Sequence, residues 1–395
     1  MKSYTPAIIH LCMLVILLHS CKQEVHRPLS DGDGSIPGPL QNVSVVNLPG
    51  AAALTYSFPA SSNILYVKAV YENRPGVTRE IRASYYNPSM TVDGFADTLP
   101  HPVKLYVVTR DEKLSAPVTV TVTPKTPPYI LAYRSLLVHA DFGGVNIEYK
   151  NPAAAELSIV ALTPDSLGAY DQFDAYHTSA GSGSYSLRGF KAENRKFGFF
   201  VKDRWGNASD TLTGVYLPLY EELLDKGRFQ EVDLPTDIPY AWGMPIPNLW
   251  DGIFSGYNMW HSADKLDGMP MWITFDLGVT AQLSRIGLWQ RNQDGFIYAQ
   301  NNLREFEIYG SAAPNPDGSW GSWTLLAHHT VVKPSGLPVG QTTTADVAAI
   351  EAGELMSVSL STPKVRYIRV KVLRTWTDGG YAANIAEMSF WGDTR

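Results

Sequence analysis

Two loop-like stretches, residues 291–302 and 374–384, carry the residue types with the clearest potential for chemistry. A planar guanidinium can donate two parallel hydrogen bonds to neighbouring hydroxyls, and an exposed aromatic ring can stack on the flat C–H face of a pyranose. These residue types indicate binding of a hydroxyl-rich ligand such as a sugar. The residues concerned are Arg291, Phe296, Tyr298, Asn301 and Asn302 in the first stretch, and Trp376 and Tyr381 in the second.

Each stretch also has a purely structural interpretation. The first can fold over its own aromatic rings. In the second, Gly379 and Gly380 let the backbone turn sharply, and Trp376 and Tyr381 can cap the end of a sandwich instead of meeting a ligand. The sequence leaves these alternatives open.

Signatures of catalysis are scarce. The chain has no Gly-x-Ser-x-Gly elbow, no His-Glu-x-x-His zinc helix, no Gly-x-Gly-x-x-Gly and no phosphate loop. The neighbours His328 and His329 lack the spaced partners of a metal site. We therefore expect a protein that is not an enzyme.

The strands that must position these loops are visible as alternating apolar residues. Apolar side chains fall at every second position in 273–277 and again in 368–372, where Arg369 and Lys371 point the other way. This is the periodicity of strands with one buried face.

The short motifs of residues 248–395 together resemble a discoidin domain, also called the coagulation-factor type C domain, of the galactose-binding-like kind. The resemblance implies a jelly-roll β-sandwich that binds ligands, very often sugars, with loops at one end. The motifs are, in order, Trp250-Asp-Gly, Trp260-His-Ser, Ile273-Thr-Phe-Asp-Leu-Gly, Phe306-Glu-Ile-Tyr-Gly-Ser, Arg366-Tyr-Ile-Arg and Ala386-Glu-Met-Ser-Phe-Trp-Gly.

The resemblance also implies roles for single residues. Arg291, with Asn301 or Asn302, matches positions that grip ring hydroxyls in sugar-binding relatives, and Trp376 followed by Tyr381 is the expected stacking platform. Trp260 matches a core position, and His261 beside it could hydrogen-bond a sugar. Two further tryptophans, Trp242 and Trp250, lie in the entry loops. They could equally pack against the edge of the sandwich instead of meeting a ligand.

A structural calcium ion is a further implication of the resemblance. Asp251 and Glu387 match positions whose carboxylates bind calcium in related domains, and carboxylate oxygens are suitable ligands. The alternative is that both residues make ordinary hydrogen bonds that hold the loop.

The preceding part of the chain predicts two related β-sandwiches in tandem, over residues 41–125 and 126–218. Gly50 is echoed by Gly143 and Gly94 by Gly189, each within a similar run of short strands. Each resembles a fibronectin type III or immunoglobulin-like domain. A connector, residues 219–247, follows, and the piece 217–226 has the leucine spacing of a short helix.

The N-terminus predicts export. Residues 1–20 read as a signal peptide that ends before Cys21, which resembles the acylated cysteine of a bacterial lipobox; a plain cleaved signal is the alternative. Residues 21–40 would then form a lipidated, flexible tether. The chain has two cysteines, one of them inside the signal, so the mature chain has no internal disulfide.

Composition narrows the class of partner. The net charge of −6 argues against nucleic acid, because no basic surplus displaces counterions from phosphates. The 21 tyrosines and 10 tryptophans suit a sugar-binding surface. The whole arrangement resembles the cell-surface lipoproteins of Bacteroidetes found beside TonB-dependent glycan-uptake systems.

The sequence therefore predicts an all-β, lipid-anchored protein of the outer-membrane surface. It would capture polysaccharide or oligosaccharide for a TonB-dependent transporter complex. The alternative is a structural or protein-interaction module of a surface complex that binds no glycan itself.

Overall fold

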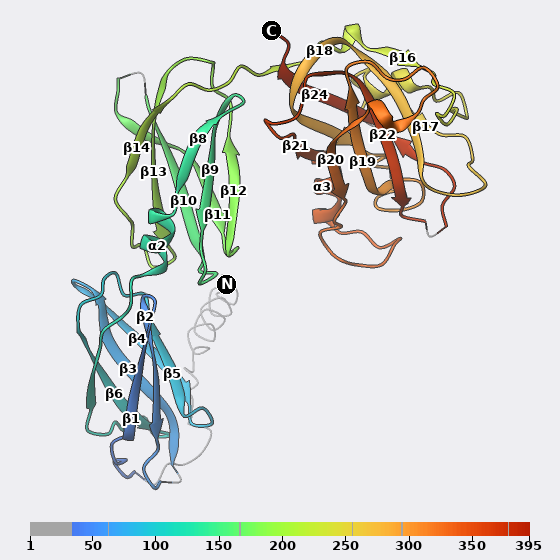
Figure 1. Cartoon of the computed structure of the whole chain (residues 1–395). Helices are drawn as coiled ribbons and strands as arrows, with labels where there is room; N and C mark the ends of the chain where they lie inside the picture. Colours follow the sequence, from blue (N-terminus) through green and yellow to red (C-terminus); the bar gives the residue numbers. More distant parts are fainter. Residues whose placement is uncertain (1–33, 62, 166, 255, 294, 378) are drawn as a thin grey trace, which may run out of the picture.

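The computed structural model describes residues 34–395 except 62, 166, 255, 294 and 378. The predicted signal peptide and Cys21 lie outside the described residues. Among those described, no helix is both long and apolar enough to cross a membrane. Three separate hydrophobic cores, with buried residues between 40 and 122, between 129 and 201 and between 224 and 390, define domain 1, domain 2 and domain 3. The three domains follow one another along the chain (Figure 1). The all-β fold class predicted from the sequence is confirmed.

Domain 1 is a sandwich of a three-stranded sheet, β1-β2-β5, and a four-stranded sheet, β4-β3-β6-β7. Its strands alternate buried and exposed residues because one face of each sheet covers the core. The strands are β1 (Gln41–Leu48), β2 (Ala51–Ser57), β3 (Ile64–Arg74), β4 (Val77–Ser84), β5 (Ser89–Asp93), β6 (His101–Thr109) and β7 (Val118–Val122).

Domain 2 has the same strand order, with sheets β8-β9-β12 and β11-β10-β13-β14. It begins with helix α2 (Pro128–Arg134), whose first position is a proline, as helix starts favour. Its strands are β8 (Leu137–Asp141), β9 (Gly144–Lys150), β10 (Leu157–Pro164), β11 (Tyr170–Thr178), β12 (Ser182–Leu187), β13 (Arg195–Asp203) and β14 (Leu212–Tyr216).

The two sandwiches close in the same way. The end of each domain pairs in parallel with its own first strands, through a bridge between Pro49 and Lys125 in domain 1 and between Phe142 and Leu219 in domain 2. In both, the backbone amide of a glycine donates to the residue at the end of the domain: Gly50 N to Lys125 O, 2.9 Å, and Gly143 N to Leu219 O, 2.8 Å. The glycine repeat in the sequence therefore corresponds to a repeated closing contact.

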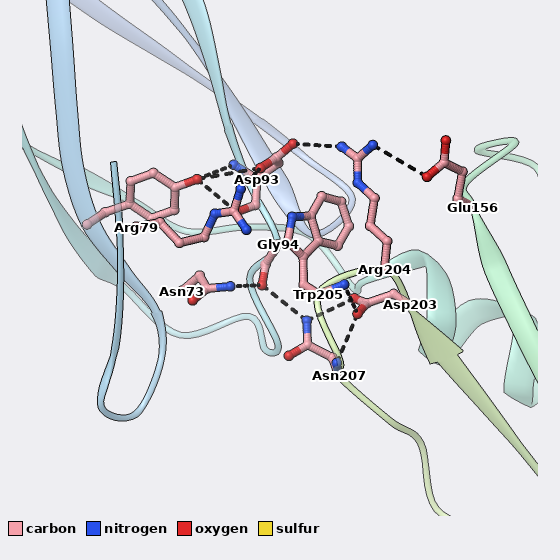
Figure 2. Close-up of polar contacts among 10 residues, drawn as sticks. Asn73, Arg79, Asp93, Gly94, Glu156, Asp203, Arg204, Trp205 and Asn207 are labelled. Carbon is pink, nitrogen blue, oxygen red and sulfur yellow. Dashed lines mark hydrogen bonds and ion pairs between the residues drawn. The ribbon is translucent and has the colours of Figure 1, made fainter. Parts of the chain in front are cut away.

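Domains 1 and 2 meet at a polar joint (Figure 2). The carbonyl of Gly94 in domain 1 accepts from the amides of Asn73, 3.0 Å, and of Asn207 in domain 2, 3.1 Å. Arg204 of domain 2 reaches Asp93 of domain 1, 3.2 Å. These contacts join the turn after β13 to the corner after β5.

Domain 3 is built around one long strand, β18 (Met271–Trp289), that belongs to both sides of the sandwich. Its first part pairs with β22 (Val365–Thr375) and its second with β24 (Glu387–Asp393). The remaining elements are β16 (Gln230–Val232), η3 (Ile246–Leu249), β17 (Trp260–His261), β19 (Leu303–Ser311), η4 (Trp320–Ser322), β20 (Thr324–Thr330), α3 (Thr344–Ala352), β21 (Glu354–Ser357) and β23 (Asn384–Ile385).

The prediction of a helix over residues 217–226 is wrong. The segment is extended, because β15 (Glu222–Leu223) pairs with β24 along the edge of domain 3, and only η2 (Lys226–Arg228) forms a single 3-10 turn. Leu223 is exposed and Leu224 buried, which is strand alternation. Strand pairing at the edge of domain 3 therefore decides the conformation of this segment, in place of the helix that its leucine spacing predicted.

Candidate functional site

Three loops of domain 3 converge at one end of its sandwich. Strand β17 pairs with β23, His261 opposite Asn384, and Asn384 also bridges to Asn302. The two stretches singled out by residue type are thereby brought together with the Trp260-His-Ser motif. We call this region the loop end.

His261 and Asn301 form a fixed polar pair at the loop end. The side-chain amide of Asn301 lies 3.1 Å from Nε2 of His261, and Nδ1 of His261 lies 2.8 Å from the carbonyl of Ser262. A carbonyl can only accept, so Nδ1 carries the proton and Nε2 accepts from Asn301. No described residue donates to the carbonyl oxygen of the Asn301 side chain, so this oxygen can accept a hydrogen bond from a ligand hydroxyl.

Arg291 lies in this region but is 7% exposed. Its guanidinium carbon lies 3.1 Å from the ring centre of Phe296 and 4.9 Å from that of Tyr257. Nε donates to Gln293, 2.7 Å, while Nη2 is buried without a partner among the described residues. Burial lowers the pKa of Arg291. Most of the guanidinium is thus stacked between rings instead of being presented as an open fork.

Asn302 and Tyr298 are both 1% exposed, so the structure corrects the expectation that they face a ligand. Asn302 donates to the carbonyls of Arg291, 2.8 Å, and Phe296, 2.9 Å, and so holds the loop closed. The ring of Tyr298 packs edge-to-face on Trp376, and burial raises the pKa of Tyr298 to about 12. For these two residues the loop folds over its own aromatics.

The two expected platforms differ. Trp376 is half-buried against the core, and its Nε1 donates to the carbonyl of Leu303, 3.1 Å. Tyr381 is 52% exposed, on a backbone whose carbonyl accepts from Lys265. Tyr381 is therefore the more available ring of the second stretch. The predicted core position of Trp260 is confirmed, since it is fully buried.

Trp242 is a candidate binding residue that the sequence analysis placed in an entry loop without assigning it a binding role. It is 79% exposed, which is unusual for so large an apolar side chain. Trp242 and Gly243 have φ of +60° and +66°, and Met244 N donates to Ala241 O, 3.0 Å, as in a type I′ turn. Left-handed backbone at a tryptophan costs energy, and residues in such conformations cluster at functional sites.

His261 anchors this turn from both sides. Ala241 N donates to His261 O, 2.9 Å, and His261 N donates to Met244 O, 3.2 Å. The turn that carries Trp242 is therefore fixed to the backbone of His261, whose side chain belongs to the His261–Asn301 pair. Tyr257, 67% exposed above Arg291, adds another ring at this end. The prolines at 239 and 245 are the sequence feature that could have placed Trp242 in a loop, because they exclude a regular strand around it.

Trp250, the other entry-loop tryptophan, is half-buried and packs against Phe229 and Phe275. Its placement matches the edge-packing alternative. It is not part of the exposed surface of the loop end.

Asp251 and Glu387 do not fit a calcium ion as they are arranged. Glu387 is fully buried, pairs with the ammonium of Lys226 and accepts Gly252 N, 3.0 Å, on its other oxygen. Asp251 accepts from Ile253 N and from the Asn258 amide. No group of three acidic, histidine or cysteine side chains suited to a metal occurs among the described residues. The calcium site stays a prediction from the resemblance.

Comparisons with known proteins bear on all three domains. Three family profiles match, each described as a domain of unknown function: DUF4959 over residues 37–124, DUF5126 over 125–227 and DUF5000 over 250–392. The chain is similar to a solved structure titled "SusE-like protein BT2857", with 33% identity, a TM-score of 0.46, and coverage of 68% of this chain and 100% of that one.

A weaker similarity links the chain to a two-domain fibronectin type III segment of chicken tenascin. That match has 10% identity, a TM-score of 0.23, and coverage of 45% of this chain and 98% of that one. A search of curated proteins found no match.

Proposed function

The chain belongs to the SusE-like family, and from this premise we propose that it is a non-catalytic glycan-binding protein of the cell surface. Polysaccharide or oligosaccharide would bind at the loop end of domain 3. Acylated Cys21 would tether the chain to the outer membrane, and domains 1 and 2 would hold domain 3 away from it, beside a TonB-dependent transporter.

The single observation that carries the proposal is the placement of Trp242. A tryptophan that is 79% exposed offers a flat apolar face, and its turn is hydrogen-bonded to the backbone of His261, a member of the polar pair. A sugar ring needs both, because its C–H faces stack on aromatic rings while its hydroxyls need hydrogen-bond partners. Tyr257 and Tyr381 extend the aromatic surface. Binding through each single ring would be weak, so many surface copies would add avidity.

A Trp242→Ala, Tyr381→Ala double variant tests this site. The chain from residue 22 onward would be run in native affinity gels that contain starch, xyloglucan, mannan or pectin, beside the variant. We expect one of these polysaccharides to retard the parent chain and the variant to lose most of that retardation. Tyr86, 89% exposed in domain 1, provides the matched control as Tyr86→Ala. Equal retardation of parent and double variant would refute the loop-end site.

A protein-interaction module is the second candidate, favoured by the apolar residues next to the loop end. Leu266 is 89% exposed and Ile253 47% exposed, and neither offers a ring to a sugar. Aliphatic and aromatic side chains together are typical of the centre of a protein interface. A defined partner recovered in mild detergent without added glycan, and lost in Leu266→Asp, would support this alternative; a recovery that depends on glycan would reject it.

A further inference from the structure

A groove of about 340 Å³ lies between domain 2 and domain 3. One wall is the outer face of the sheet β8-β9-β12, and the other is the segment 357–360, which starts at the last residue of β21. The volume is within the usual range for small-ligand sites. The groove involves none of the loop-end residues.

The domain 2 wall presents a straight row of polar residues. His139, Asn146 and Ser186 are register partners across the three strands. The Asn146 amide donates to Ser186 Oγ, 3.0 Å, which in turn donates to Asp141, 2.6 Å. Neither the Asn146 side-chain carbonyl nor the His139 imidazole makes a hydrogen bond within the described part of the chain. Both remain available to a ligand, while their neighbours fix the row.

The charges around the groove are already paired with one another. Arg188 lies 3.3 Å from Asp141 and 2.7 Å from Glu221, and Arg285 of domain 3 lies 3.3 Å from Glu221. Two cations and two anions thus cancel within one network. None of these four charges is left to pair with a ligand, which selects against a strongly charged ligand.

Glu221 holds both walls in place. Ser284 of domain 3 donates to Glu221 Oε1, 2.5 Å, and the carbonyl of Ser284 accepts Val358 N, 2.8 Å. The Glu221 side chain is 7% exposed, so this connection is shielded from water. The width of the groove is therefore set by hydrogen bonds to one buried carboxylate.

We propose that this groove is a second saccharide site, for one neutral sugar residue of a polysaccharide. The Asn146 carbonyl and His139 imidazole bind hydroxyls from the domain 2 side. Ser357 and Ser359 face them, and Leu360, 39% exposed, contacts the C–H surface. This inference rests on the proposed function, since it gives a glycan-binding chain a second contact at the domain 2 to domain 3 junction.

Saturation-transfer difference NMR on the chain from residue 22 onward tests the proposal. The probes are glucose, galactose, mannose and xylose, with glucuronate as the charged comparison. We expect at least one neutral sugar to bind the parent chain, and His139→Ala with Asn146→Ala to weaken that binding about tenfold, the usual effect of losing one or two hydrogen bonds. His177→Ala, on β11 of the opposite sheet of domain 2, is the matched control and should bind normally.

Two further variants keep the result decisive. Ser184→Leu fills the groove from an exposed position and should act like the double variant even if that variant folds poorly. The Trp242→Ala, Tyr381→Ala variant should keep a sugar signal, because its groove is intact. If the loop-end variant loses all signal while the groove variants lose none, the groove site is overturned and the proposed function stands. Binding of glucuronate alone would also overturn it, and absence of any sugar signal would count against both.

Discussion

The indole of Trp205 in domain 2 packs directly against Gly94 of domain 1. A β-carbon at Gly94 would lie 2.9 Å from both Cγ and Cδ1 of Trp205. Gly94 also has φ of +83°, a conformation that other residues rarely adopt. Figure 2 shows Trp205 between Gly94 and Arg204, whose guanidinium carbon lies 4.4 Å from the indole centre. The joint between the two sandwiches therefore requires a glycine.

We predict that Gly94→Ala loosens this joint. The added carbon must displace the indole, and with it the hydrogen bond from Asn207 to the Gly94 carbonyl. Small-angle X-ray scattering should show a wider distribution of domain separations than in the parent chain. Gly76→Ala is the matched control, because Gly76 has φ of +75° but open space around it.

Both variants should lose about 1 kcal/mol of stability from backbone strain. Only Gly94→Ala should also change the scattering curve. Identical curves for the two variants would show that the Trp205 contact does not hold the domains together.

Trp376→Ala should destabilise domain 3, although the sequence ranks Trp376 as the first stacking platform. Its ring packs on Tyr298 and the core, and its Nε1 hydrogen bond to Leu303 would be lost. We expect a loss of about 2 kcal/mol for this half-buried ring. Trp242→Ala should change stability by only about 0.5 kcal/mol, as exposed substitutions usually do. Urea unfolding followed by circular dichroism measures both, and a reversed order of the two losses would contradict this assignment.

The strands of all three domains could be expected from the sequence because alternation directly reports a buried face. Ile273, Phe275 and Leu277 are all fully buried. The repeat of Gly50 in Gly143 likewise predicted two similar sandwiches, which share one strand order. Such patterns are local, so a single chain reveals them.

The exposure of loop side chains could not be predicted in this way. Asn301 and Asn302 are neighbours of the same type. Asn302 is buried and donates to two backbone carbonyls, whereas Asn301 contacts His261. Trp242 stands out because a turn fastened to His261 directs it outward. These outcomes depend on contacts between segments that are distant in sequence, which residue spacing does not encode.

Domain 3 should become less stable as the pH rises from 5 to 8. Burial raises the pKa of Glu387 to about 7 and that of Asp237 to about 6. A carboxyl whose folded pKa is raised contributes stability that is present below its unfolded pKa near 4.5 and is lost as pH rises through the folded value. Glu387→Gln should reduce the loss between pH 5 and 8 by about 2 kcal/mol. Urea midpoints at both pH values measure it, and an equal loss in variant and parent would contradict the prediction.

Calcium should not stabilise the parent chain, because the Lys226 ammonium already neutralises Glu387. Removing that cation in Lys226→Ala leaves the buried Glu387 carboxyl near Asp251, whose charge contributes to the raised pKa of Glu387. A divalent cation could then bind both carboxylates through hard oxygen ligands. We expect millimolar calcium to raise the melting temperature of Lys226→Ala by several degrees, in the usual way of a ligand that binds only the folded state. Differential scanning fluorimetry with calcium or EDTA measures both chains. Stabilisation of the parent chain by calcium would instead support the metal site implied by the discoidin resemblance.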